Sequence, residues 1–456
     1  MRALCSGGWL TLRRVSRLTK SASTDLKISG RLVDAPIWYD ATWPEDEYKR
    51  RYVGNLRHVG QPLNLRKTGS GTLLLNNISS TTTGRIEFAE GVLKLGKRGN
   101  SQDPATKSAL GNLAISNRVA LVLSGGTLEF TASDTLGQAS CVNFATFVVS
   151  NATLRSMNES GKETGWANSL PFLELYDAKF EMNGGLATGD DPGPYGTFIF
   201  TQRVKWDGTR PYDIQPNGKG NCFALNYAND FYAEPRAGTS LTNWHGKGEF
   251  WVADITKDAR PDVTIGVVLK DQATWTGGSR YGKTIRFRCG LLKTGPGTLC
   301  LNGTGIVPGL SDNRYYTEAT RVNGGTLLID SQAFQSTNIF VQAGAWLGGT
   351  GTVKRATIEV GGGFTAAPGQ TRALNLQAVE LPADKVVRLD VPCTEDLETV
   401  TALRVPVVNA AGLVEAKWTC TVNGAPAPTG YSARAVVSGG VVYASLAKSG
   451  MVLIIR

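Results

Sequence analysis

One ten-residue segment occurs twice in this chain in nearly the same form, and it constrains the fold more than any other feature. Residues 67–76 read KTGSGTLLLN and residues 293–302 read KTGPGTLCLN, so that eight of the ten positions are identical. Weaker copies, in which one or two small residues precede a short alternating segment, lie around both of them. These copies begin at residues 91, 125, 151, 324 and 344. Self-similarity of this kind predicts a stacked repeat architecture.

The repeated segments have the pattern of half-buried β-strands. In the first copy, Leu73 and Leu75 fall on one face of a strand, and Thr72 and Leu74 fall on the other. The glycines ahead of the strand permit a sharp corner with positive φ. A leucine marks each copy, at steps of 20, 35 and 26 residues in the first half and of 28 and 20 in the second. These markers are Leu73, Leu93, Leu128, Leu154, Leu299, Leu327 and Leu347.

Steps of that length match one coil of a solenoid with a loop of variable length. Amphipathic helices are not expected, because Gly, Thr and Asn are spread too densely along the chain. We therefore predict an all-β protein whose main part, residues 61–400, is a right-handed parallel β-helix. A β-sandwich is the alternative, since it also consists of short strands with regular turns. Residues 1–60 are predicted to be a basic lead-in that adds at most an irregular first coil. Residues 401–456 are predicted to be a small C-terminal β cap over the last coil.

Two segments resemble a known bacterial repeat. KTGSGTLLLN…TGRIEFAEGVLKLG at 67–96 resembles the passenger-associated, or autotransporter-associated, β-strand repeat, and so does KTGPGTLCLNG…TEATRVNGGTLLID at 293–330. LGGTGTVKRATIEVGGGFTAAPG at 347–369 is similar to the segment that commonly follows such repeats near the end of a passenger solenoid. The resemblance implies a bacterial protein that is secreted or held at the cell surface. It implies no particular activity, because a fold does not determine a function.

Charge and hydropathy exclude several classes of protein. The net charge is +10, but residues 1–67 carry +7 of it, which leaves the body nearly neutral. A nucleic-acid partner is therefore not expected, because its binding site would be a basic stripe on the folded body. No apolar run approaches the roughly 18 residues of a membrane-spanning segment. Ser6, Gly7 and Gly8 interrupt the apolar run that a secretory signal requires. Whether this chain is a piece of a longer one is left open.

The cysteines and histidines do not form a metal-binding pattern. The seven cysteines include no CxxC pair, and neither His58 nor His245 has a cysteine nearby. A structural zinc site is therefore not expected. The cysteines are predicted to be mostly small buried hydrophobic residues, with a disulfide between Cys289 and Cys300 as the less favoured alternative. No cofactor is expected, and calcium is the one option kept open.

The section from residue 160 to 290 lacks the clean repeat and carries the candidate catalytic groups. A polysaccharide hydrolase would need two carboxyl groups, and a lyase would need a base, often with calcium held by carboxylates. The candidates here are Asp190, Asp191, Asp254, Asp258, Asp262 and His245. No complete motif surrounds them, since HGKG at 245–248 is only a partial match. The favoured interpretation is a turn before Pro192 and a polar loop at 254–262.

Three tryptophans of the same section are candidates for glycan binding. Trp206, Trp244 and Trp251 could stack on sugar rings if they were exposed, although burial is the more common fate of large aromatic side chains. We favour a non-catalytic function, in which the solenoid is a rigid, adhesin-like stalk. Binding of a cell-surface or extracellular polysaccharide, or its cleavage, is kept as the alternative.

Overall fold

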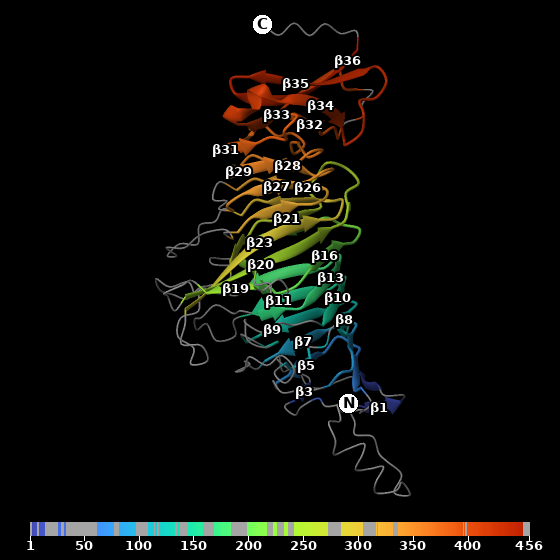
Figure 1. Cartoon of the computed structure of the whole chain (residues 1–456). Coiled ribbons are helices and arrows are strands. Elements are labelled where there is room, and N and C mark those ends of the chain that lie inside the picture. The colour runs from blue at the N-terminus through green and yellow to red at the C-terminus, as the bar shows by residue number, and fades with distance from the viewer. Residues whose placement is uncertain are drawn as a thin grey trace, which may run out of the picture.

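The computed structural model shows one elongated stack of strands, with the N-terminal strands at one end and the C-terminal strands at the other (Figure 1). The structure describes the following residues: 2–6, 9–13, 26–28, 32, 62–76, 82–96, 108–113, 115, 118–132, 135–136, 145–157, 168–183, 198–216, 222–225, 232–235, 241–271, 284–303, 316, 318–331, 336–394, 396 and 399–449. Within them, one short 3-10 helix, η1 (Ala411–Glu415), accompanies the strands. The all-β prediction is confirmed.

The longest sheet runs along the whole stack, and its strands pair in parallel. From β4 (Asn64–Lys67) to β33 (Ala402–Asn409), twelve successive parallel pairings join one coil to the next. Parallel pairing of this extent excludes the β-sandwich, whose sheets are antiparallel. The strands between them are β6 (Ile86–Phe88), β8 (Val119–Leu123), β10 (Thr146–Ser150), β13 (Phe172–Tyr176), β16 (Val204–Asp207), β20 (Leu241–Val252), β23 (Thr284–Thr294), β25 (Thr320–Val322), β27 (Ile339–Val341), β29 (Thr352–Ile358) and β31 (Leu374–Glu380).

A second set of parallel strands follows the first after a bend. In the N-terminal half it consists of β3 (Leu26–Ile28), β5 (Thr72–Leu75), β7 (Val92–Leu95), β9 (Thr127–Phe130), β11 (Thr153–Met157) and β14 (Lys179–Asn183). In the C-terminal half it consists of β17 (Tyr212–Ile214), β21 (Val263–Ile265), β24 (Thr298–Leu301), β26 (Thr326–Ile329), β28 (Trp346–Gly348), β30 (Gly363–Phe364), β32 (Val386–Val391) and β34 (Lys417–Val422).

The leucine markers of the sequence repeat lie directly above one another. Leu73 pairs with Leu93, Leu93 with Leu128, and Leu128 with Leu154 across successive parallel strands. All four are fully buried. The strand β5 alternates as expected, with Leu73 and Leu75 buried and the two residues between and before them partly exposed. Leu299, Leu327 and Leu347 form the corresponding ladder in the second half. The core is therefore built between coils and not within any one of them.

Most bends between the two strands of a coil are only two to four residues long, and glycines with positive φ occupy them. Gly91 has φ +87°, and a Cβ at this position would lie 2.3 Å from the carbonyl oxygen of Gly71 in the preceding coil. Gly325 has φ +62°, and its Cβ would lie 2.3 Å from the oxygen of Gly297. Both contacts are too close for any side chain. At these two positions the bends of successive coils therefore stack backbone on backbone, which only glycine permits.

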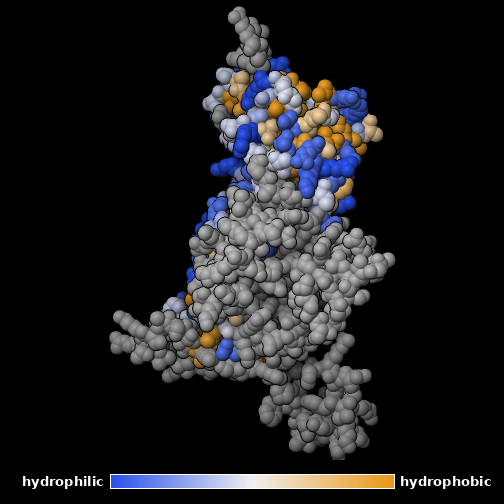
Figure 2. All heavy atoms as spheres, turned by 90° about the vertical axis from the view of Figure 1, so that its left-hand side faces the viewer, coloured by the Kyte–Doolittle hydropathy of each residue, from blue (hydrophilic) through white to orange (hydrophobic). Residues whose placement is uncertain are grey.

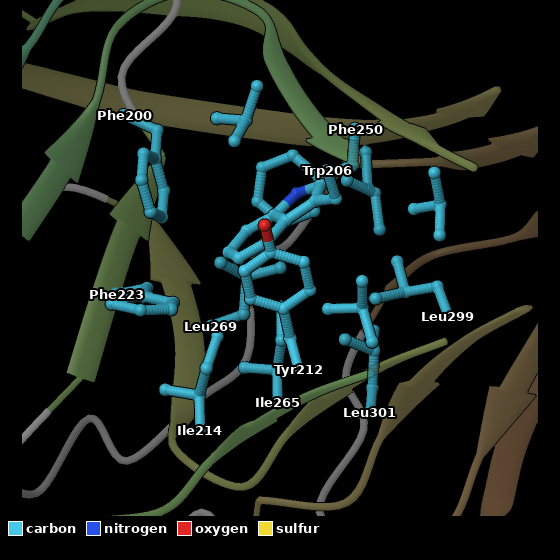
Figure 3. Close-up of a cluster of buried hydrophobic side chains, with 14 of the residues drawn as sticks. Phe200, Trp206, Tyr212, Ile214, Phe223, Phe250, Ile265, Leu269, Leu299 and Leu301 are labelled. Carbon is cyan, nitrogen blue, oxygen red and sulfur yellow. The ribbon is translucent and has the colours of Figure 1, made fainter. Parts of the chain in front are cut away.

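A third, short sheet widens the middle of the stack. Its strands are β12 (Asn168–Leu170), β15 (Phe198–Phe200), β18 (Cys222–Leu225) and β22 (Val268–Asp271), all paired in parallel. Phe200 and Phe223 from this sheet meet Trp206 and Phe250 from the long sheet and Tyr212 after the bend (Figure 3). These five side chains are buried, so the aromatic residues of the middle section form the core of the wide coils.

At each end of the stack, some of the described strands pair in the antiparallel direction. At the N-terminal end, β1 (Arg2–Ser6) pairs antiparallel with β2 (Trp9–Arg13), and β2 then pairs in parallel with β4. At the C-terminal end, β36 (Val441–Lys448) lies antiparallel between β33 and β35 (Tyr431–Ser438). Parallel pairing thus continues past residue 400. The strand β33 belongs both to the last coil and to the terminal three-stranded sheet, which is therefore continuous with the long sheet.

Candidate functional site

The aspartates of the loop 253–262, between β20 and β21, serve the loop itself. Asp258 binds Arg260 through an ion pair of 2.6 Å, and that guanidinium lowers the pKa of the Asp258 carboxyl. Asp254 accepts a hydrogen bond of 3.1 Å from the backbone N–H of Lys257, which has φ +59°. Both carboxylates thus have partners within the loop itself. This arrangement supports the polar-loop interpretation of the segment.

Asp262 is fully buried and fastens this loop to the next coil. Its Oδ1 accepts hydrogen bonds of 2.7 Å from the N–H groups of Ile255 and Thr256, and of 3.0 Å from the Thr256 hydroxyl. Its Oδ2 accepts one of 2.6 Å from the N–H of Thr298. Burial raises the pKa of this carboxyl, while the hydrogen bonds oppose the rise. Both carboxylate oxygens accept hydrogen bonds from the protein, so Asp262 acts as a link between coils.

Carboxylates make similar links at other bends. Asp177 accepts hydrogen bonds from the N–H groups of Thr209 and Arg210, at 2.8 and 2.9 Å. Although burial works in the opposite direction, these bonds hold the pKa of Asp177 below its usual value. Asp330 binds the N–H of Thr350, and Asp390 binds the hydroxyl of Thr421. Sequence reasoning missed these links, because single aspartates in turns carry no pattern.

Trp206 cannot bind a glycan from solution. Its side chain is fully buried, and its ring lies 5.2 Å from that of Tyr212 and 5.9 Å from that of Phe250 (Figure 3). Trp206 is therefore unavailable as a glycan-binding residue, and the burial expected as the more common fate of large aromatic side chains is the one observed. The physical reason is that Val204 and Trp206 occupy inward positions of β16, while Lys205 and Asp207 occupy outward ones.

Trp251 belongs to a cluster on the outer face of the long sheet, which we call the Lys205 cluster and define as Tyr176, Lys205, Asp207 and Trp251. Lys205 is the cross-strand partner of Trp251. Its Nζ lies 4.8 Å from the ring centroid of Tyr176 and 5.3 Å from that of Trp251. It also donates a 3.0 Å hydrogen bond to the Tyr176 hydroxyl and pairs with Asp207 at 3.0 Å. These two interactions raise the pKa of Lys205.

The Lys205 cluster ties together three coils, β13, β16 and β20. Trp251 is half-buried, and it touches the coils on both sides. A Cβ at Gly295, in the next bend, would lie 3.1 Å from the Trp251 ring. The tryptophan is thus packed between Lys205 and that bend, which leaves a limited part of the ring for any ligand. Cation–π contacts of this kind stabilise neighbouring coils.

The two lysines that open the repeat hold the most distinctive arrangement in the molecule. Lys293 is fully buried, and its Nζ donates to the carbonyl oxygens of Thr294 and Gly295 at 3.0 Å and of Gly324 at 2.9 Å. Lys67 makes the same contacts in the first copy: its Nζ donates to Thr68, Gly69 and Glu90. In each copy, the third acceptor is the residue directly before the positive-φ glycine of the next bend. We call this arrangement the lysine clasp.

Burial strongly affects the charge of Lys293. It lowers the pKa of this amine to about 7, whereas the nearby carboxylate of Asp262 favours the charged form. Sequence reasoning noted both lysines only as identical letters in the repeat and assigned them no role. Their recurrence at the first position of both copies was the available signal.

A ladder of alternating charge crosses four strands of the second sheet. Lys94, Glu129, Arg155 and Glu181 are successive cross-strand partners. Glu129 is only 4% exposed, and it pairs with Lys94 at 2.9 Å and with Arg155 at 3.2 Å. Arg155 continues to Glu181 at 2.6 Å. We call these residues the charge ladder.

The other residues singled out from the sequence either lie outside the described part of the structure or are buried. Asp190 and Asp191 lie outside the described residues. His245 and Trp244 lie on β20, but their side chains are outside the described part. Cys289, Cys300 and Cys393 are buried free thiols, as predicted for most of the cysteines. In the described ranges, no group of three or more His, Cys, Asp or Glu side chains is placed to hold a metal ion.

Comparison with known families identifies the repeat. The model of the passenger-associated-transport-repeat matches residues 65–95 and 291–329. The chain carries two passenger-associated transport repeats. The resemblance seen in the sequence is thereby confirmed for both copies, and each match contains one lysine clasp. No curated protein matches the chain. Across the part of the chain that the structure describes, no helix is both long and apolar enough to cross a membrane.

Each passenger-associated transport repeat spans two bends and the strands on either side of them. The first match runs from Leu65 to Leu95, and so covers β4, β5, β6 and β7. The second runs from Leu291 to Ile329, and so covers the end of β23 together with β24, β25 and β26. The unit that the family model detects is therefore a pair of consecutive coils held together at the bend.

Proposed function

We propose that this chain is a passenger domain of the autotransporter type, that its coils close into a right-handed parallel β-helix, and that it works as a rigid stalk at the cell surface or outside the cell. The observation that carries the proposal is the unbroken parallel pairing from β4 to β33. Twelve steps of about 4.8 Å give the stack a length of about 58 Å. The described residues place no set of converging catalytic groups on it.

The packing supports a rigid structure along the whole length of the stack. Its stability comes from contacts between neighbouring coils, namely the leucine ladders, the lysine clasps and the buried aspartates. A solenoid of this kind has no single weak hinge, because every coil is fixed to the next by many small contributions. The repeat family supports a location at the surface or in the medium.

Small-angle X-ray scattering of the purified chain tests the shape. The expected result is an elongated particle that is wider at its middle and whose length exceeds the estimate above. A compact scattering profile would contradict the proposal. Enzymatic activity needs a separate assay, in which the chain is incubated with neutral and acidic polysaccharides, with and without calcium. New reducing or unsaturated ends that disappear in Asp254→Ala would show a lyase or hydrolase instead.

A further inference from the structure

The C-terminal end of the stack has an unusual charge composition. Residues 416–456 contain no aspartate and no glutamate, although they include Lys417, Arg434, Lys448 and Arg456. The three strands of the terminal sheet, β33, β36 and β35, likewise contain no acidic residue. Surface of both hydrophilic and apolar character lies side by side at this end of the molecule (Figure 2).

Two arginines stand in one row across this sheet. Arg404 of β33 and Arg434 of β35 are both cross-strand partners of Ser445 in β36. The neighbouring row, Val405 and Ala444, is buried in the core, so the arginine row faces outward. Both arginines are exposed, whereas Ser445 between them is 4% exposed. Two strand spacings separate the arginine backbones by about 10 Å.

An apolar row runs beside the arginine row on the same face. It consists of Pro406, Tyr443 and Val436, which are partners across the three strands. The guanidinium carbon of Arg404 lies 4.1 Å from the ring centroid of Tyr443, so the ring supports and orients this arginine. We define the terminal face as these two rows.

Some surface cations near this end of the stack are paired with acids. Arg355 pairs with Glu380, and Lys385 pairs with Glu415. Among the described residues, neither Arg404 nor Arg434 makes an ion pair with an acid. Their guanidinium groups therefore keep donors that can bind an anion in two-pronged geometry.

We propose that the terminal face binds an anionic polysaccharide, with Arg404 and Arg434 each holding one carboxylate or sulfate group. Arg404 is held over the Tyr443 ring and Arg434 stands two strands away, so a polymer that carries acidic groups on successive sugars can engage both arginines. The Pro406–Tyr443–Val436 row offers an apolar surface for the sugar rings between them. A nucleic acid fits less well, because its affinity depends on many phosphate contacts.

The test measures binding of the full chain to immobilised polygalacturonate and dextran sulfate, with uncharged dextran as the reference polymer. The expected result is salt-sensitive binding to both acidic polymers and none to dextran. The variant Arg404→Ala/Arg434→Ala is expected to bind at least fivefold more weakly. The matched control Arg355→Ala/Lys385→Ala removes the same number of positive charges from the surface and is expected to bind as the wild type does.

Several outcomes would overturn the inference. Equal binding by the Arg404/Arg434 variant would place the interaction elsewhere, for example on the basic residues near the N-terminus. An equal loss of binding in the control variant would show that binding depends only on the net positive charge of the protein. Stronger binding of single-stranded DNA, or of vesicles that contain anionic lipid, through the same two arginines would assign the face to a different partner. Circular dichroism checks that each variant is folded.

Discussion

Lys293 donates a hydrogen bond of 2.9 Å to the carbonyl oxygen of Gly324, which lies in the following coil directly before the turn glycine Gly325. The same ammonium group also binds the oxygens of its own bend. The first residue of the repeat thus secures the bend of one coil to the bend of the next. Lys67 repeats this relationship with Glu90 at the other end of the molecule.

Replacing Lys293 by methionine should destabilise the junction between these coils at a pH well above 7, where the amine is neutral and its burial carries no charge penalty. The substitution keeps a similar length but leaves three carbonyl groups without their donor, at a cost of about 1–3 kcal/mol. Because solenoids open locally, the measurement is amide hydrogen exchange in residues 318–331. Lys354→Met, at an exposed position of β29, is the control and should change protection by less than about 0.5 kcal/mol. Equal protection in both variants would contradict the clasp.

The stability of this junction should rise with pH. The pKa of Lys293 in the folded chain is about 7, lower than its ordinary value of 10.5. Between these values the unfolded chain binds a proton that the folded chain has released. Stability therefore increases across this window, by on the order of 1 kcal/mol per pH unit at most, and the cost of the buried charge is present in full below pH 7. Denaturation between pH 6 and 10 should show this slope in the wild type and lose it in Lys293→Met. An identical slope in both proteins would refute the assignment.

The two glutamates of the charge ladder should differ sharply in their effect. Glu129 is buried between Lys94 and Arg155, so Glu129→Ala leaves two cations without their shared partner and should cost about 2–3 kcal/mol. Glu181 is more exposed and pairs only with Arg155, so Glu181→Ala should cost less than about 1 kcal/mol. Urea denaturation of both variants makes the comparison, and similar losses would argue against a cooperative ladder.

Removal of the Asp262 carboxylate should release the loop 253–262. Asp262→Ala deprives Ile255, Thr256 and Thr298 of their acceptor, and Lys257 is the exposed trypsin site in this loop. Cleavage after Lys257 should become at least tenfold faster, since proteolysis follows local opening. Asp330→Ala, which removes a comparable carboxylate link to Thr350 at a different bend and leaves the residues around Lys257 unchanged, provides the control. Unchanged cleavage in Asp262→Ala would show that the loop is held by other contacts.

The sequence predicted the parts of the fold that depend on periodic burial. Leu73, Leu93, Leu128 and Leu154 were markers of a repeat, and they became register partners because stacked coils must align their inward positions. Whether Trp206 is exposed or buried could not be decided from the sequence, because the middle section has no visible repeat. Its inward position is evident only from the register of β16 with β13 and β20.

The links between coils were not predictable for a similar reason. Asp262 lies in a polar loop, close in sequence to Asp258 and Arg260, so the sequence suggested that its carboxylate is at the surface. Only the three-dimensional return of the chain brings the Thr298 N–H to it, 36 residues later. The partners of Lys293 are likewise backbone oxygens. Every residue has a backbone carbonyl group, so the sequence does not show which of them accepts a hydrogen bond.

The bends and the return connections of this molecule are subject to very different constraints. Between β25 and β26 the bend has three residues, and its glycine touches the backbone below. By contrast, the separation from the end of β7 to the start of β8 spans residues 96–118, while β28 and β29 are separated only by residues 349–351. Evolution can therefore lengthen, shorten or exchange the return connections coil by coil. The molecule thus has one tightly constrained edge, which determines its shape, and one edge at which the chain accommodates connections of very different length.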